Sequence, residues 1–251
     1  MNRWFLLENL VLKDFRVRYR NMSLGILWSV ANPLLMMGLL TFVFTCVYPN
    51  RAIAHFALFI LCALVPYHFY SLALSAGTTS LWDNEALVKR SQCPRRAFPV
   101  AAVLANCLHF FIQIGLLLAL ALAFGRGVNR YWPLLALAWL MEVAFMCGLT
   151  LITAVLDVFY RDVRYLAEAS AMVMFWLVPV FYSVSMVPHR YQLLFMLNPV
   201  AAVALVNRVV LLEGRAPAAH LMAALIGVSV GMFVAGLRIF ARLEHNLADY
   251  L

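Results

Sequence analysis

The stretch 100-VAAVLANCLHFFIQIGLLLALALAF-124 contains no Asp, Glu, Lys or Arg. As an α-helix it would be about 37 Å long at 1.5 Å per residue, which is enough to cross the roughly 30 Å hydrocarbon layer of a bilayer. The run is too long and too uniformly apolar to be the core helix of a soluble domain. It therefore predicts a transmembrane helix.

The composition of the whole chain supports the same interpretation. Of 251 residues, 65% are hydrophobic and 12% are charged, whereas a soluble domain has about 45–50% apolar and 25% charged residues. The net charge is +8, but the basic residues flank apolar runs instead of forming a stripe, so they predict membrane anchors and no nucleic-acid partner.

Similar apolar runs occur along the chain and predict an all-α integral membrane protein with six transmembrane helices. The first residues, 4–20, carry aromatic and apolar residues on one face and basic residues on the other, which predicts an N-terminal amphipathic interface helix. Residues 185–219 are apolar but broken by proline and glycine, which predicts short re-entrant helices between spans five and six. The six predicted spans are residues 24–48, 55–74, 100–124, 132–156, 166–184 and 220–240.

Orientation follows from the 19 Lys and Arg residues. Most of them lie in the segments that share a side with the N-terminus, so the N- and C-termini are expected in the cytoplasm. No repeat, low-complexity tract or linker divides the chain, and residues 1–251 are expected to form a single transmembrane domain.

No catalytic or metal-binding constellation is expected. The sequence has no GxxxxGK[ST] phosphate loop, and its six histidines and five cysteines show no metal-ligand spacing. The cysteines in the apolar runs are expected to be buried. Glu142 is the only acid well inside a predicted span, where it either lines a polar path or forms a hydrogen bond with a neighbouring helix. Pro33, Pro66 and Pro179 lie inside predicted spans and are expected to kink them.

Two segments resemble a known family. The segment 12-LKDFRVRYRNMSLGILWSVANPLLMMGLLTFVF-44 resembles the opening of the permease subunit of ABC polysaccharide exporters, with its patterns D-x-x-x-R-Y-R, S-x-L-G-x-L-W and N-P-L. The segment 84-NEALVKRSQCPRRAFPVAAVLAN-106 resembles the family's first cytoplasmic loop, although Cys93 stands where the family usually has Phe. Weaker similarities are 179-PVFY-182, 198-NP-199 and Arg208.

The resemblance implies a fold and a function. The family exports O-antigen, capsular polysaccharide or teichoic acid across the bacterial cytoplasmic (inner) membrane. Two copies of a six-span subunit with re-entrant helices pair around a channel, and two separate ATPase subunits dock beneath them. This chain would then be a transport subunit that is not itself an enzyme and has no cofactor of its own, because ATP and Mg would bind to the partner ATPase. The cargo would be lipid-linked polysaccharide, with O-antigen as the first expectation, pushed outward as the ATPases close.

The resemblance also implies a coupling site. The first cytoplasmic loop is expected to contact the ATPase through an exposed apolar pair, Leu87 and Val88, set among charges. The alternative is a plain cytoplasmic anchor. The predicted ATPase-coupling residues are Asn84, Leu87, Val88, Lys89, Arg90, Pro94 and Arg95.

Aromatic residues of the first and fifth spans are the candidates for a substrate channel. Aromatic faces stack on sugar rings and let a polymer slide, but lipid contact enriches the same residues. The predicted channel residues are Trp28, Tyr48, Trp176, Phe181 and Tyr182.

Other functions stay open. An ABC exporter permease for capsule, teichoic acid, another lipid or a drug would share these motifs. An ion-coupled secondary transporter would show inverted repeats and several buried charges. A membrane-embedded enzyme on lipid-linked sugars would show paired carboxylates or clustered histidines. Neither of these last two patterns is found in the sequence.

Overall fold

The computed structural model describes residues 9–13, 27–47, 53, 55–90 and 94–247. Every element within these ranges is a helix, and they include no strand, which confirms the predicted all-α class. A π-helical turn, η2 (Val43–Val47), continues α2, and the 3₁₀ turns are η3 (Val184–Met186) and η4 (Glu244–Asn246). The α-helices are α2 (Trp28–Phe42), α3 (Phe56–Thr79), α4 (Glu85–Arg90), α5 (Ala97–Ala123), α6 (Trp132–Phe159), α7 (Val163–Leu177), α8 (His189–Leu197), α9 (Pro199–Leu211) and α10 (Ala219–Leu243).

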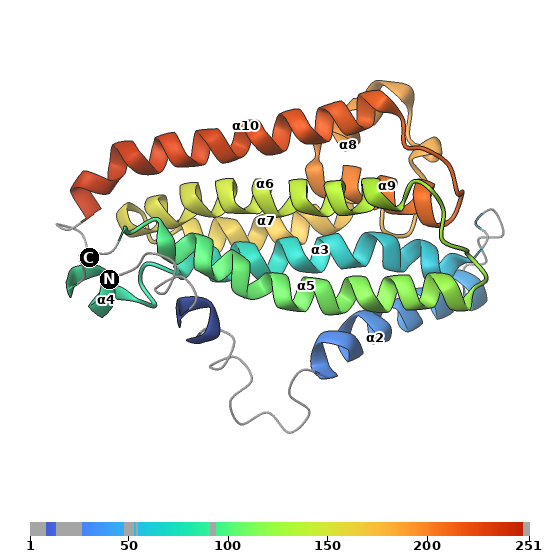
Figure 1. The fold of residues 1–251 in the computed structure, drawn as a ribbon, viewed down its shortest axis with the longest axis horizontal. Coiled ribbons are helices and arrows are strands. Elements are labelled where there is room, and N and C mark those ends of the chain that lie inside the picture. Colours follow the sequence, from blue (N-terminus) through green and yellow to red (C-terminus); the bar gives the residue numbers. More distant parts are fainter. Residues whose placement is uncertain (1–8, 14–26, 48–52, 54, 91–93, 248–251) are drawn as a thin grey trace.

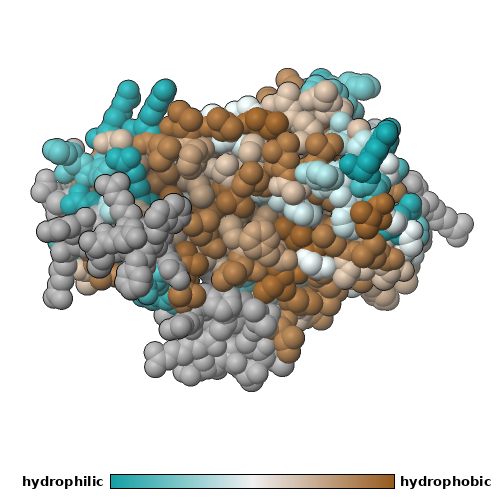
Figure 2. Space-filling view, viewed as in Figure 1, coloured by the Kyte–Doolittle hydropathy of each residue, from teal (hydrophilic) through white to brown (hydrophobic). Residues whose placement is uncertain are grey.

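Five of these helices are long and apolar enough to cross a membrane: α2 with η2, α3, α5, α6 and α10. The pair α8 and α9 passes the same test as one unit bent by 99°, which gives a sixth candidate. This bent pair is the interrupted helical segment predicted for residues 185–219. Figure 2 shows a broad apolar belt between two polar ends, as expected of a protein surrounded by lipid.

The predicted fifth span, residues 166–184, differs from the observed helix. Helix α7 begins earlier, at Val163, and ends at Leu177. Pro179 therefore follows the helix instead of kinking it. The cause is local, because a residue before proline is driven out of the α-region, and Val178 is extended, with φ −81° and ψ 128°.

Helix α3 lies at the centre of the bundle, where it packs against α5, α6, α7 and α9. Helix α10 runs along one side of α6, and α2 lies at an edge against α3 and α5 (Figure 1). Helices α2 and α3 have nearly the same mean hydropathy, 1.9 and 1.8, yet 6% of the α2 span and 72% of the α3 span is buried. Most of α2 is thus left for contact with lipid or another protein.

Glycines bring α6 and α10 into backbone contact. A Cβ atom added at Gly236 would meet the carbonyl oxygen of Gly148, and one added at Gly148 would meet the backbone of Met232. Without a hydrophobic driving force between helices, close packing of this kind is a main source of their association in a membrane.

The two prolines inside helices each leave one backbone carbonyl without its helical N–H donor, four residues earlier. For Pro66 that carbonyl belongs to Cys62, and it accepts a hydrogen bond of 2.9 Å from Nδ2 of Asn207 in α9. For Pro33 it belongs to Ser29, and it accepts one of 3.2 Å from Nε2 of Gln113 in α5. Amide side chains of other helices thus satisfy both breaks, as a hydrocarbon environment requires.

The remaining sequence predictions have mixed outcomes. Residues 9–13 are helical, and the rest of the predicted interface helix at 4–20 lies outside the described residues. Cys62, Cys107 and Cys147 are buried as expected, but Cys46 is exposed. The expectation for Cys46 was wrong because it lies in η2, which has no buried residue.

Candidate coupling and translocation site

The predicted coupling loop contains the short helix α4, fixed at its start by Asn84. The carbonyl of Asn84 accepts hydrogen bonds from the N–H groups of Leu87 and Val88, at 2.9 and 3.0 Å. Its side-chain Nδ2 donates to the carbonyl of Ser80, at 2.8 Å, and its Oδ1 accepts from Nζ of Lys13, at 2.6 Å. Asn84 therefore ties α4 both to the end of α3 and to the N-terminal segment.

The apolar pair predicted to be exposed on this loop is split by the fold. Leu87 is 45% exposed, whereas Val88 is 3% exposed and packs in a cluster with Leu10, Leu81 and Phe98. The prediction of an exposed Val88 was wrong, because successive residues of a short helix point in different directions. Leu87 is the member of the pair that a partner could contact.

Charged residues lie on both sides of Leu87 in the sequence, and two of them hold the loop to the end of α10. Lys89 forms an exposed ion pair with Glu85, at 2.6 Å. Arg95 donates to the carbonyl oxygen of Glu244, at 2.7 Å, while Arg96 pairs with the Glu244 carboxylate at 3.1 Å. Pro94 is exposed, and the side chain of Arg90 lies outside what the structure describes. Helix α4 and the end of α10 accordingly lie at the same end of the bundle (Figure 1).

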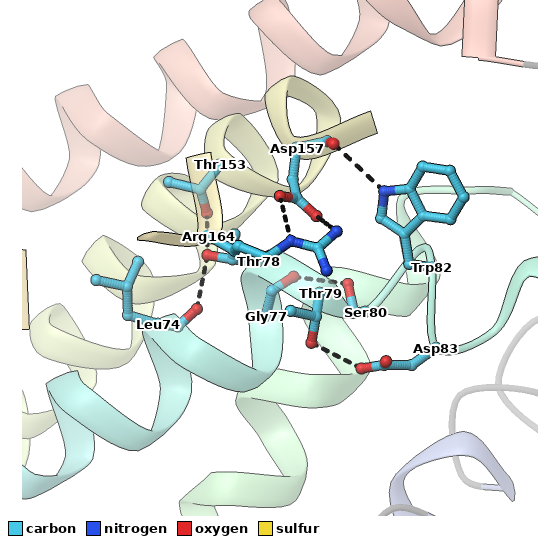
Figure 3. Close-up of polar contacts among 10 residues, drawn as sticks. All are labelled: Leu74, Gly77, Thr78, Thr79, Ser80, Trp82, Asp83, Thr153, Asp157 and Arg164. Carbon is cyan, nitrogen blue, oxygen red and sulfur yellow. Dashed lines mark hydrogen bonds and ion pairs between the residues drawn. The ribbon is translucent and has the colours of Figure 1, made fainter. Parts of the chain in front are cut away.

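A polar cluster next to α4 connects α3, α6 and α7 (Figure 3). Asp157 of α6 is fully buried and pairs with Arg164 of α7 through two contacts of 3.2 and 3.3 Å. The indole N–H of Trp82 donates to the Asp157 carbonyl at 3.3 Å. The hydroxyl of Thr78 bridges the carbonyl of Leu74, at 2.7 Å, and the hydroxyl of Thr153, at 2.8 Å.

This cluster was not predicted from the sequence. The fourth span was expected to end at residue 156, but α6 continues to Phe159 and so includes Asp157. The signal was present in the dense charges of 157-DVFYRDVRY-165, directly after an apolar run. Because Trp82 lies two residues before Asn84, the cluster gives α4 a direct physical connection to α6 and, through the ion pair, to α7.

Three of the predicted channel aromatics lie together at the other end of α7. Trp176 is 65% exposed, and its ring meets that of Phe181 edge to face, with the centroids 5.5 Å apart. Phe181 also contacts Tyr182 at 5.4 Å and stacks on Phe44 of η2 at 5.2 Å. The hydroxyl of Tyr182 donates to the carbonyl of Trp176 at 2.8 Å. These rings join α2 to α7 as a connected aromatic surface.

The other two predicted channel residues lie elsewhere. Trp28 is at the start of α2, 48% exposed, and lines a separate pocket of about 490 Å³ between α2, α3 and α5. Tyr48 lies outside the described residues. The sequence analysis grouped these aromatics by span. Trp28 at the start of α2 lines the pocket, whereas Phe44, in the π-helical turn that continues α2, contacts Phe181.

Arg208 holds the non-helical segment between α7 and η3. It is 4% exposed, and its guanidinium donates to the carbonyls of Phe59, at 3.1 Å, Pro179, and Val180, at 2.9 Å. Its charge also lies over the ring of Phe59, 3.4 Å from the centroid. The arginine thereby satisfies carbonyls of the non-helical segment that follows α7, and it connects this segment to α3.

Buried acids and metal ligands offer little chemistry here. Glu142 is fully buried in α6, and neither carboxylate oxygen has a hydrogen-bond partner among the described residues. The same described ranges contain no group of three His, Cys, Asp or Glu residues that could hold a metal ion. The described residues instead form a short helix with an exposed leucine, an aromatic cluster and a polar pocket.

These features define a multi-pass helical membrane protein in which polar contacts connect the loop that contains α4 to helices α6 and α7. The chain belongs to the ABC-2 type transporter family, which it matches over residues 6–212. Among its relatives is the O-antigen export system permease protein RfbA of Klebsiella pneumoniae, 28% identical over 243 residues, which are 95% of this chain and 92% of the relative.

Two further relatives widen the comparison. The protein of the same name from Myxococcus xanthus is 28% identical over 246 residues, covering 97% of this chain and 94% of the relative. The polysialic acid transport protein KpsM of Escherichia coli is 21% identical over 212 residues, covering 82% of this chain and 81% of the relative.

Proposed function

We propose that two copies of this chain form the membrane channel of an ATP-driven exporter of lipid-linked polysaccharide, with O-antigen as its cargo. The observation that carries this proposal is the similarity over nearly the whole chain to O-antigen export permeases from two organisms. The aromatic cluster of the exposed Trp176 and the partly buried Phe181 and Tyr182 supports it, because aromatic faces stack on sugar rings and tolerate sliding.

The energy would come from two separate ABC ATPase subunits that bind ATP and Mg²⁺, since the chain has no phosphate loop of its own. They would dock on α4 from the cytoplasm, with the exporter in the bacterial inner membrane and both termini inside. Leu87, the exposed apolar residue of α4, is the expected contact. The Trp82 and Asp157–Arg164 contacts would then pass motion of α4 to α6 and α7.

Pairing of two copies is supported by the exposed faces of α2 and α7. Leu35, Leu39 and Phe42 of α2 and Met172 and Trp176 of α7 are each more than half exposed. A closed two-fold pair is the commonest assembly for such surfaces. Two copies could line a conduit wide enough for a hydrated sugar chain, which a single small bundle can barely enclose.

Deletion of the gene in its source organism tests the proposed function. The expected result is loss of surface polysaccharide with accumulation of lipid-linked polymer inside the cell, both reversed by the wild-type chain. Surface polysaccharide at normal levels in the deletion strain, with no internal accumulation, would reject the proposal.

A matched pair of variants tests the docking helix. Leu87→Asp should abolish co-purification with the ATPase and stop export, because a charge enters the exposed contact while the fold is untouched. Val88→Asp should instead reduce the amount of folded protein, because its charge would be buried without a partner. ATPase binding by Leu87→Asp at the wild-type level would contradict the assignment of Leu87.

Capsular polysaccharide is the second candidate cargo, favoured by the similarity to a polysialic acid transport protein. The lipid-linked polymer that accumulates in the deletion strain distinguishes the two. Its composition by mass spectrometry would match either the O-antigen repeat or the capsule repeat of that strain.

A further inference from the structure

The pocket between α2, α3 and α5 is polar, and its lining among the described residues includes two histidines but no Lys, Arg, Asp or Glu. It has a volume of about 490 Å³. Its polar lining includes Ser29 and Asn32 of α2, His68 and Ser71 of α3, and His109 and Gln113 of α5. Its volume lies within the range of about 300–1,000 Å³ typical of small-molecule sites.

The pocket lies near the middle of two membrane-spanning helices. His68 is close to the midpoint of α3 (Phe56–Thr79), and His109 and Gln113 are close to that of α5 (Ala97–Ala123). Polar groups at this depth are costly against hydrocarbon and usually face a polar path. Trp28 and Leu72 of the lining are 48% and 38% exposed, so the pocket opens at the edge of the bundle beside α2.

The proline of α2 fixes the orientation of the key side chain. Pro33 has no N–H, so the carbonyl of Ser29 is left to accept a hydrogen bond from Nε2 of Gln113, at 3.2 Å. A carbonyl can only accept, and this identifies the amide end of Gln113 that faces it as the NH₂. The opposite end, Oε1, is buried without a donor, and Gln113 as a whole is 3% exposed. Gln113 lines the pocket, so the wall of the pocket contains an acceptor that requires a donor from outside the described residues.

Aromatic rings and a hydroxyl–imidazole pair line the same pocket as this acceptor. Trp28 and Tyr67 line the same pocket, and Tyr67 is held in place by its hydroxyl, which donates to the Ala171 carbonyl at 3.3 Å. Nδ1 of His109 lies 2.7 Å from the Ser29 hydroxyl, which holds α5 against α2. An aromatic face beside neutral donors and acceptors is a surface that suits a sugar ring with several hydroxyl groups.

The geometry points to a binding site here for one uncharged, hydroxyl-rich pyranose unit of the exported polymer. This inference rests on the proposed function and adds to it the charge class of the cargo. A sugar hydroxyl would donate to Oε1 of Gln113, while the ring would lie against Trp28 or Tyr67. A sugar carboxylate would find no Lys or Arg among the described residues of the lining and would be repelled by the Gln113 oxygen.

Saturation-transfer NMR on the full chain in lipid nanodiscs tests this binding directly. The probes are the methyl glycosides of mannose, galactose and N-acetylglucosamine, with methyl glucuronide as the anionic counterpart. We expect at least one neutral glycoside to bind and the glucuronide not to bind. Gln113→Leu, which keeps the side-chain size, should weaken that binding roughly tenfold, the effect of losing one buried hydrogen bond.

The matched control is Ser229→Ala, which removes a fully buried hydroxyl from α10, outside the pocket. This variant should leave the binding of the neutral glycosides unchanged. His68→Phe, which keeps a ring of similar shape, should weaken binding as Gln113→Leu does. Equal binding by wild type and Gln113→Leu, or binding of the glucuronide as strong as that of the neutral glycosides, would overturn the inference.

The outcome for the pocket is separable from the outcome for the proposed function. Absence of binding by all the neutral glycosides, together with normal export by Gln113→Leu in the deletion strain, would mean that the pocket holds water only and would overturn this inference alone. Absence of a polysaccharide phenotype in the deletion strain would reject the proposed function itself.

Discussion

The breaks at Pro66 and Pro33 are the same local event in two different settings. Each proline frees one carbonyl, and an amide side chain from another helix donates to it, Asn207 to Cys62 and Gln113 to Ser29. Asn207 is fully buried, and its oxygen accepts from the indole N–H of Trp139 at 3.0 Å. Gln113 is also buried, but it lines the pocket between α2, α3 and α5, and its oxygen has no donor among the described residues.

The difference separates a structural amide from one available to a ligand. In hydrocarbon an unpaired polar group is costly, so a complete pair of hydrogen bonds indicates a part of the bundle that stays fixed. An incomplete pair beside a pocket indicates a place where another molecule supplies the missing donor. The surroundings agree, because Asn207 holds the buried helix α3, and Gln113 holds the exposed helix α2.

The largest loss of stability is expected in the region around Asn207, whose hydrogen bonds are complete. It should come from substitution of its neighbour in α9, Arg208. Arg208→Met would leave the carbonyls of Pro179 and Val180 without their donor in a buried segment. The apparent free energy of unfolding should fall by about 3 kcal/mol or more, because each buried carbonyl left without a donor costs about 1–3 kcal/mol. Thermal unfolding in detergent measures this, with the exposed Arg190→Met as control. Equal losses for the two variants would contradict the role of Arg208.

Comparison of Asn207→Leu with Gln113→Leu tests whether the amide with both ends hydrogen-bonded contributes more stability than the amide with one end unpaired. Asn207→Leu would leave both the Cys62 carbonyl and the Trp139 N–H unpaired, so the loss should be about 1–3 kcal/mol. Gln113→Leu unpairs only the Ser29 carbonyl and should cost less, about 0.6 kcal/mol. The two midpoints of thermal unfolding, measured side by side, check the order. A larger cost for Gln113→Leu would invert the comparison.

The helical break itself can be removed. Pro66→Ala would restore an N–H donor for the Cys62 carbonyl, so Asn207 would lose its role there. The double variant Pro66→Ala with Asn207→Leu should then be less destabilised than the sum of the single variants, with a coupling energy of about 0.6–1.7 kcal/mol. Strict additivity in the double-mutant cycle would show that proline and amide act independently.

The smallest effect on stability is expected for an exposed aromatic residue, Trp176. Trp176→Ala should change the free energy of unfolding by less than about 0.5 kcal/mol, because the ring is 65% exposed. Export per inserted molecule should nevertheless fall several-fold if the ring lines the path. Phe181→Ala serves as the comparison, because its ring stacks on Phe44 and its removal should also cost stability. Unchanged export by Trp176→Ala would assign that ring to lipid.

The sequence by itself determined which segments cross or enter the membrane. Long uncharged runs require lipid or protein around them whatever their neighbours are, so the helical class and the bent pair α8 and α9 could be predicted. The loop with α4 could be located in the same way, because its charges and apolar residues are adjacent in the chain. The end of α7 was placed too late, since the effect of Pro179 on Val178 was taken as a kink.

Only the tertiary structure decided which faces of these helices are buried and which polar groups meet. Helices α2 and α3 have almost equal hydropathy and very different burial, because lipid and protein interiors are equally apolar and the sequence pattern does not separate them. The split of Leu87 from Val88 and the pairing of Asp157 with Arg164 depend on rotation about helix axes. The hydrogen bonds from Gln113 to the Ser29 carbonyl and from Asn207 to the Cys62 carbonyl are made across the bundle, between residues that are far apart in the chain.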